Sequence, residues 1–207
     1  GGWGETQKLN DLWVYQFDSN TWKPVQQKGS IPSARSSHGV AVVGNYMYLF
    51  GGIGEKKHND FYRFNLLTNT WNAVKQENNP GTRSSYGGLH VYNGDLYLFA
   101  GLTCGKLNDI FKFEIEKGKW TRIDPVNEAP SKRGRHSCVI VEDCLFSFGG
   151  YAGIETVNDL YRFELKSKQW NLIKSGGAPK KREAHSMLVK GTNEIVIFGG
   201  MNGSCWY

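Results

Sequence analysis

The sequence predicts an all-β propeller made of four-stranded antiparallel blades. The first observation is an apolar run that ends on two small residues, as in "YMYLFGG" at 46–52, and that recurs along the chain. The second is the spacing of these endings, which follow one another at steps of 50, 49, 49 and 50 residues. A period near 50 indicates an array of one supersecondary unit. The endings begin at Gly1, Gly51, Ala100, Gly149 and Gly199.

Two further sets of residues recur at the same spacing. We call each set of residues at equivalent positions of successive repeats a column. In every copy a tryptophan stands 11 residues after the aspartate of an Asn-Asp pair. Three unlike columns that stay in register four times predict that each copy has the same structure. The tryptophans are Trp22, Trp71, Trp120 and Trp170, and the aspartates are Asp11, Asp60, Asp109 and Asp159.

Each copy contains four short apolar stretches. In the copy after residue 35 they are "HGVAVV" (38–43), the run that ends on Gly-Gly (46–52), "NDFYRFNL" (59–66) and "WNAV" (71–74). The second stretch is apolar at nearly every position, as a strand buried on both faces should be. The third alternates apolar and polar residues, and no stretch has helical periodicity. Four antiparallel strands in each repeat are typical of a propeller blade, and glycine suits the close turn after the second strand.

The repeats divide the chain into one propeller segment over residues 1–207. We expect a half-blade at 1–28, three complete blades at 35–75, 83–124 and 133–174, and a half-blade at 182–201. Two architectures stay open at this stage. The chain forms a partial propeller, or the two half-blades combine and close a ring of about four repeats. The first residue is not methionine, so we expect a piece of a longer protein.

Composition restricts the class of function. The formal charge of +6, from 25 Lys and Arg against 19 Asp and Glu, fits ordinary surface bias, and we expect no nucleic-acid partner. No run approaches the ~18 apolar residues of a membrane helix, so we expect no membrane association. The four cysteines fall in different columns without paired spacing, which favours free thiols in a reducing compartment. We therefore expect a cytoplasmic protein, with the nucleus as the alternative.

Most columns have a structural interpretation. We expect the tryptophans to pack between blades and the Asn-Asp pairs to cap turns or bond to backbone before the third strand. One histidine per blade precedes the first strand, with Tyr86 in its place in one copy. A metal site would not need one histidine on each blade, so no metal or other cofactor is expected.

The combination of Gly-Gly after an apolar run, Asn-Asp, an aromatic residue and tryptophan at this spacing resembles the kelch repeat over essentially the whole chain. An added R-x-x-H element at 35–38, 133–136 and 182–185 looks like the subgroup of leucine-zipper-like regulator and Rab-effector kelch proteins. In kelch proteins with known ligands, this arginine, the residue after it and the residue after Gly-Gly commonly face the ligand.

That resemblance implies a partner-binding face around the arginine column. The basic loops "SKRGR" (131–135) and "KKR" (180–182) add charge beside it. Glu183 departs from the small residue of the other copies and would oppose an anion. The other interpretation is that each arginine pairs with a neighbouring blade or with solvent. The candidate residues are Arg35, Ser36, Arg83, Ser84, Arg133, Arg182, Trp3, Ile53, Leu102, Tyr151 and Met201.

We expect a protein–protein interaction module that binds an acidic or phosphorylated protein segment, as a substrate-recognition or scaffold domain of a larger protein such as a ubiquitin-ligase adaptor or GTPase effector. A cytoskeletal or cell-polarity scaffold is the alternative. A kelch-type metal-dependent enzyme is disfavoured, because the chain has no E-x-x-x-D-x-x-x-H iron motif and its histidines are spread over the blades. Self-association is expected if the propeller arc is open.

Overall fold

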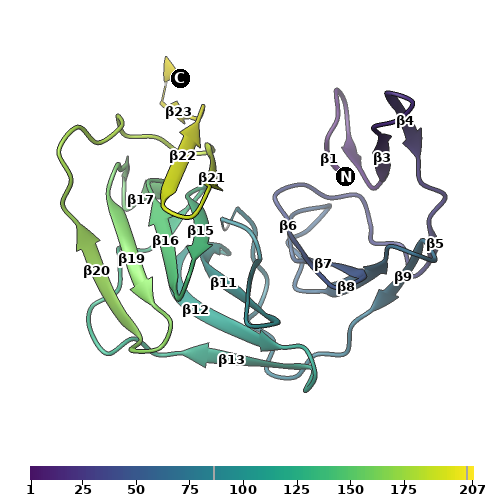
Figure 1. The fold of residues 1–207 in the computed structure, drawn as a ribbon, viewed down its shortest axis with the longest axis horizontal. Coiled ribbons are helices and arrows are strands. Elements are labelled where there is room, and N and C mark those ends of the chain that lie inside the picture. The colour runs from purple at the N-terminus through teal and green to yellow at the C-terminus, as the bar shows by residue number, and fades with distance from the viewer. Residues whose placement is uncertain (86, 204) are drawn as a thin grey trace.

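The sheets of the protein form an open, curled arc around a central channel. The computed structural model describes residues 1–85, 87–203 and 205–207, and this part of the chain contains no helix. Figure 1 shows the N-terminal strands and the C-terminal hairpin on opposite sides of the opening in the arc. In the same residues there is no helix of the length and apolarity that crossing a membrane requires. The expected all-β kelch propeller is therefore confirmed in its partial form.

Three sheets each contain the four strands of a complete blade. The first contains β6 (Gly39–Val43), β7 (Tyr46–Phe50), β8 (Phe61–Asn65) and β9 (Thr70–Ala73). The second contains β10 (His90–Tyr92), β11 (Asp95–Leu102), β12 (Lys106–Glu114) and β13 (Lys119–Ile123), and the third β15 (Ser137–Val141), β16 (Cys144–Phe148), β19 (Leu160–Glu164) and β20 (Gln169–Ile173). All neighbours within these blades are antiparallel.

The two ends of the chain form two-stranded sheets. Strands β3 (Trp13–Gln16) and β4 (Thr21–Pro24) correspond to the third and fourth strands of a blade, and β21 (Ser186–Lys190) and β22 (Glu194–Phe198) to the first and second. Short strands lie in the connections: β1 (Gly2–Trp3), β2 (Lys8–Leu9), β5 (Lys28–Gly29), β14 (Arg133–Gly134), β17 (Tyr151–Ala152), β18 (Glu155–Thr156), β23 (Met201–Asn202) and β24 (Cys205–Trp206).

The first strands of the blades lie innermost. Strand β10 contacts β6 and β15, and β15 contacts β21, so these strands surround the channel. The tryptophan-bearing strands β9, β13 and β20 lie on the outside. The connection before each blade runs along this outer strand, as β5 does in parallel with β9.

The tryptophan column forms much of the core between blades, as the sequence predicts. Trp71, Trp120 and Trp170 are buried. The ring of Trp120 lies 5.1 Å from that of Phe50 in the preceding blade, which links the two sheets through aromatic contact. Trp22 in the N-terminal half-blade is 66% exposed, and among the described residues β3 and β4 pair only with each other.

The Gly-Gly endings combine an unusual backbone conformation with close packing. Gly51 and Gly52 both have positive φ, at 63° and 94°. A Cβ atom on Gly51 would lie 2.6 Å from the carbonyl oxygen of Arg83 in the next blade. Both reasons favour glycine, and they confirm the interpretation of this column.

Candidate partner-binding face

Two loops of each blade meet on the face of the arc where the Gly-Gly pairs lie. The residue after the column arginine pairs with the residue after Gly-Gly through the backbone. Ser36 and Ile53 exchange two hydrogen bonds, and so do Ser84 and Leu102. Glu183 and Met201 do the same, while Gly134 lies opposite Tyr151 in β14–β17. The structure therefore brings together the two loop positions that the sequence selected, whereas their role in partner binding remains a prediction.

The arginine side chains of the complete blades do not face this surface. Arg35, Arg83 and Arg133 are at most 2% exposed. The Arg133 guanidinium donates to both carboxylate oxygens of Asp159, at 2.7 and 2.9 Å, and to the carbonyl oxygen of Gly149 at 3.0 Å. At these three positions the structure shows buried arginines that each neutralise a carboxylate inside their own blade, and not side chains exposed to a partner.

The Asn-Asp column supplies those carboxylates. Asp60 and Asp109 bind Arg35 and Arg83 in the same two-oxygen arrangement. The expectation of turn caps is thus wrong for these aspartates. The asparagine does bond to backbone, but not before the third strand: the Asn108 amide donates to the carbonyl oxygen of Pro130 at 3.1 Å, in the connection that follows β13.

The arginine also joins neighbouring blades. The Arg83 backbone N–H donates to the carbonyl oxygen of His58 at 3.0 Å, and its carbonyl oxygen accepts from the Gly52 N–H at 2.9 Å. Its side chain meanwhile binds Ala100 and Asp109 in its own blade. One residue thereby connects two sheets.

Arg182 is the exception in the column. It is only half-buried, and it donates to the carbonyl oxygens of Lys180 and Gly199. Its guanidinium lies 4.5 Å from the centre of the Tyr207 ring. Within the described residues it has no carboxylate partner, because β22 is not followed by a third strand.

A lysine column that the sequence analysis missed supplies positive charge at this end of the arc. Lys8, Lys57 and Lys106 follow one another at steps of 49 residues. Each ammonium group donates to a carbonyl oxygen in the loop of the next blade: Lys8 to Gly54 at 2.6 Å, Lys57 to Thr103, and Lys106 to Gly153 at 2.6 Å. The repeat period could have revealed this column, because its phase matches that of the Asn-Asp pairs.

A cavity of ≈ 400 Å³ lies among these loops. Lys57, Lys106 and Arg135 line it, together with Tyr151 and Glu183. The Lys106 ammonium lies 4.0 Å from the centre of the Tyr151 ring, and Arg135 donates to Glu183 at 2.9 Å. Three cations against one buried carboxylate leave the cavity positive, which suits an anionic group.

A second cavity, of ≈ 390 Å³, is lined by His38, His136 and His185 of the histidine column. Burial, with the neighbouring Arg133 cation next in effect, lowers the pKa of His136 to about 3. Burial likewise lowers the pKa of His38, His90 and His185 to about 4. These rings are neutral at pH 7. Tyr86, which replaces histidine in one copy, lies outside the described residues.

The cysteines and candidate metal ligands add no further site in the part of the chain that is described. Cys104 and Cys205 are exposed, Cys138 is buried and Cys144 is intermediate, and all four are free thiols. Among residues 1–85, 87–203 and 205–207, no group of three or more His, Cys, Asp or Glu side chains is arranged to hold a metal ion.

Comparison with known proteins matches the chain to the family model "KLHDC2/KLHL20/DRC7 Kelch-repeats domain" at residues 1–101 and 78–207. A leucine-zipper-like transcriptional regulator 1 homolog of Drosophila melanogaster is 40% identical over 74 residues, which is 35% of this chain and 8% of that protein. Kelch domain-containing protein 2 of Bos taurus is 36% identical over 72 residues, 34% of this chain and 18% of that protein.

An enzyme is also among the relatives. The N-(sulfonatooxy)prop-2-enimidothioate sulfolyase of Thlaspi arvense is 31% identical over 80 residues, 36% of this chain and 22% of the enzyme. The matched segments thus span less than a quarter of each of these three relatives.

Proposed function

The chain belongs to the kelch-repeat family, a family of protein-interaction modules. From this premise we propose that the surface formed by the loops after Gly-Gly and after the column arginines, here called the Gly-Gly face, binds an acidic or phosphorylated segment of a protein partner. The observation that carries the proposal is the ≈ 400 Å³ cavity lined by Lys57, Lys106 and Arg135. Lysine and arginine bind carboxylate and phosphate through charge-assisted hydrogen bonds.

The contacts we propose differ from those expected from the arginine column. A side chain that is buried and bound to an aspartate is not available to a partner, so Arg35, Arg83 and Arg133 act as supports. The exposed neighbours Trp3 and Tyr151, with the half-buried Ile53, Leu102 and Met201, offer apolar contact around the cations. Arg182 stays a candidate contact.

The role in a larger assembly is a further step of the proposal. A substrate-recognition or scaffold domain, such as that of a ubiquitin-ligase adaptor or GTPase effector, fits a face that recognises a short charged segment. A cytoskeletal or cell-polarity scaffold is the alternative, since the same loops would serve it and the attached domains decide between them.

The test uses a fluorescent poly-glutamate peptide and its phosphoserine counterpart, titrated by fluorescence anisotropy. We expect binding that weakens at least tenfold in the Lys57→Ala/Lys106→Ala variant. Lys23→Ala/Lys119→Ala is the matched control, because it removes two exposed lysines from outer strands. Equal loss in both variants would indicate attraction by net charge alone and would contradict a site.

The sulfolyase relative makes a metal-dependent enzyme the second candidate. Metal analysis of the purified protein separates the two classes. Stoichiometric iron or copper would favour the enzyme, whereas metal-free protein that binds the peptides would favour the interaction module.

A further inference from the structure

The cavity on the Gly-Gly face contains an ion pair that the repeat itself does not require. Both positions after the column arginine are serine in two copies, at 36–37 and 84–85. In each of the next two copies one of these positions is charged, as Arg135 and then as Glu183. The two side chains meet, since the Arg135 guanidinium donates to Oε1 of Glu183 at 2.9 Å. Because other copies form the same loops with serine, packing of the repeat does not explain this pair.

The two partners differ in their exposure to water. The Glu183 side chain is 8% exposed, whereas that of Arg135 is 52% exposed. Oε1 of Glu183 accepts from Arg135, and Oε2 is buried without a hydrogen-bond partner among the described residues. A buried carboxylate that lacks donors carries a large cost in free energy. Glu183 is therefore a fixed acceptor with unused capacity, and Arg135 is a donor that has room to reorient.

The backbone holds both residues at the cavity. The Ala184 N–H donates to the carbonyl oxygen of Arg135 at 2.8 Å, which places the two loops side by side. The side chains of Arg135 and Glu183 line the ≈ 400 Å³ cavity together with Lys57 and Lys106. The same cavity thus offers a ligand three cations and one acceptor.

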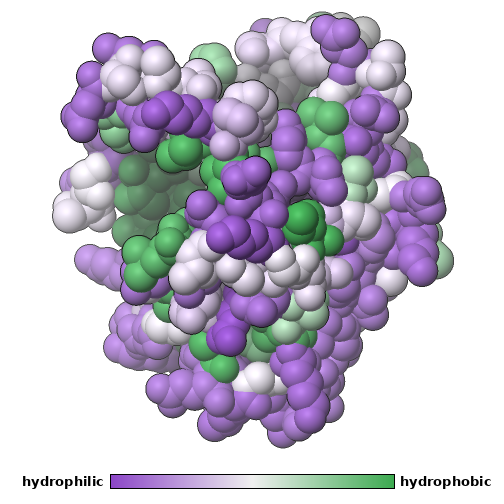
Figure 2. All heavy atoms as spheres, turned by 90° about the vertical axis from the view of Figure 1, so that its right-hand side faces the viewer, coloured by the Kyte–Doolittle hydropathy of each residue, from purple (hydrophilic) through white to green (hydrophobic). Residues whose placement is uncertain are grey.

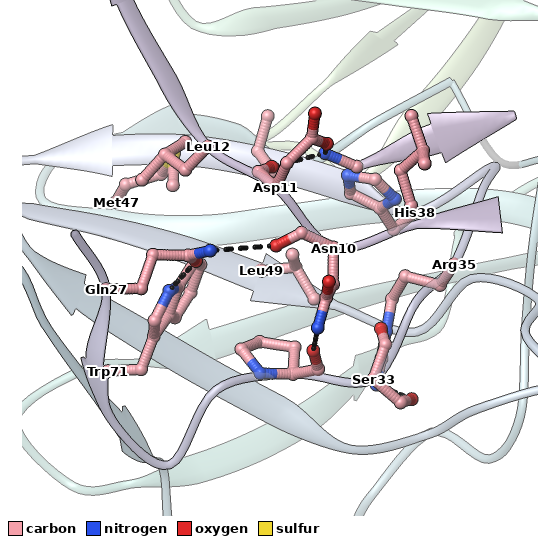
Figure 3. A pocket seen from close by; sticks show the side chains of 14 residues that line it. Asn10, Asp11, Leu12, Gln27, Ser33, Arg35, His38, Met47, Leu49 and Trp71 are labelled. Atoms are coloured by element: carbon pink, nitrogen blue, oxygen red, sulfur yellow. Dashed lines mark hydrogen bonds and ion pairs between the residues drawn. The ribbon is translucent and has the colours of Figure 1, made fainter. Parts of the chain in front are cut away.

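The polar groups around Trp71 show a contrasting arrangement. In Figure 3 the side chain of Gln27 accepts from the Trp71 indole and donates to the carbonyl oxygen of Asn10. The Asn10 amide donates in turn to the carbonyl oxygen of Pro32. These amide groups find their partners within the fold and need no ligand, whereas Oε2 of Glu183 finds none among the described residues.

We propose that the cavity binds a segment of mixed charge, in which a lysine or arginine lies next to the acidic or phosphorylated residue; this inference rests on the function proposed above. The anion of the segment binds Lys57 and Lys106 and attracts Arg135, and its cation donates to Glu183. A lone anion would draw Arg135 away only by leaving a buried carboxylate unpaired. A segment that brings its own cation replaces the lost donor. Glu183 is thereby the residue that selects mixed-charge segments over purely acidic ones.

Attraction by net charge predicts the opposite preference. The formal charge of the chain is +6, and Figure 2 shows hydrophilic residues over most of one side of the molecule. A purely acidic peptide is attracted to such a surface as a whole, so exchange of one of its glutamates for lysine should weaken that attraction. The two explanations differ in sign, and exchange of a peptide residue separates them.

The first test compares three fluorescent peptides of equal length by fluorescence anisotropy. One is the poly-glutamate peptide, and the other two carry lysine or alanine in place of its central glutamate. We expect the lysine peptide to bind at least about fivefold more tightly than the alanine peptide. Equal or weaker binding of the lysine peptide, with poly-glutamate binding that still depends on Lys57 and Lys106, would overturn this inference alone. No binding by any of the three peptides would overturn the proposed function as well.

Substitution of the acceptor supplies the second test. Glu183→Gln removes the charge with little change in shape, so the preference for the lysine peptide should disappear and the poly-glutamate peptide should bind more tightly. Glu55→Gln is the matched control, because Glu55 is an exposed glutamate of a loop on the same face and does not line the cavity. A preference that persists in Glu183→Gln, or that is lost equally in both variants, would contradict the proposal.

A third test separates recognition from a purely structural ion pair. Arg135→Ser introduces the residue that two other copies have at this position. The poly-glutamate peptide should then bind more weakly, because one cation is gone, while the lysine peptide keeps its advantage over the alanine peptide. Circular dichroism monitors folding of each variant. Loss of that advantage in folded Arg135→Ser would show that Glu183 is not the acceptor and would overturn the proposal.

Discussion

The arginine column and the lysine column belong to the same repeat and to the same end of the arc, yet they differ in environment. Arg83 is fully buried and bound to Asp109 and to a carbonyl oxygen. Lys57, from the neighbouring loop, lines an open cavity and reaches across to the next blade. The two columns, which share one repeat period, therefore have different roles. The buried arginines hold the blades together, and the lysines place positive charge at the cavity.

The largest effect should come from removing a buried arginine. Arg83→Ala leaves the carboxylate of Asp109 without its partner, and we expect a loss of about 3–5 kcal/mol in the free energy of unfolding, measured in urea. In Arg83→Ala/Asp109→Asn the orphan charge is gone, so the loss should be smaller. A loss below about 1 kcal/mol in Arg83→Ala would show that the arginine contributes no more to stability than the lysines do, and would contradict the difference between the two columns.

The second largest effect should come from low pH, which lowers the free energy of unfolding through the buried His136. The pKa of His136 is about 3 in the folded protein, against 6.5 in the unfolded chain. Because the unfolded state binds protons first, the stabilisation is complete above pH 6.5 and is lost as pH falls towards 3. At pH 5 the free energy of unfolding that is lost through His136 is about 2 kcal/mol. Unfolding midpoints between pH 7 and 5 measure it, and His136→Gln should flatten the slope.

A buried group without a partner sharpens the comparison further. The indoles of Trp71 and Trp120 donate to Gln27 and Gln76, at 2.6 and 2.8 Å. The indole nitrogen of Trp170 has no partner within the described residues, and Val126 occupies the position that corresponds to Gln27 and Gln76. Val126→Gln should therefore stabilise the protein by about 1 kcal/mol in thermal or urea unfolding. Gln76→Val should cost a similar amount, and opposite signs would contradict the argument.

The smallest effect on stability should belong to the lysines. Lys57→Ala should change the free energy of unfolding by about 1 kcal/mol, because this half-buried side chain loses one hydrogen bond, to the carbonyl oxygen of Thr103. Urea unfolding beside Arg83→Ala measures the difference. A large loss in the free energy of unfolding would show that the lysine hydrogen bonds between loops stabilise the arc. The lysine column would then have a structural role instead of a role in binding.

The sequence predicted the architecture because a period of about 50 residues repeats both strand pattern and turns. The resemblance to the kelch repeat also selected the two loop positions, such as Ser36 and Ile53, that the structure brings together. It did not indicate which way a side chain points. The arginine and aspartate columns lie 25 or 26 residues apart, and this spacing alone does not show that Arg35 turns inward to Asp60. For that reason the sequence left open whether these arginines face a partner or pair within the fold, and it did not indicate the lysine column.

The position of each column arginine has a mechanical consequence. Since the main chain of Arg83 is hydrogen-bonded to the preceding sheet and its guanidinium to its own, these two blades can part only if the backbone hydrogen bonds or the ion pair with Asp109 break. We therefore expect the complete sheets to melt together in a single transition, whereas many arrays of repeated units lose their members one at a time.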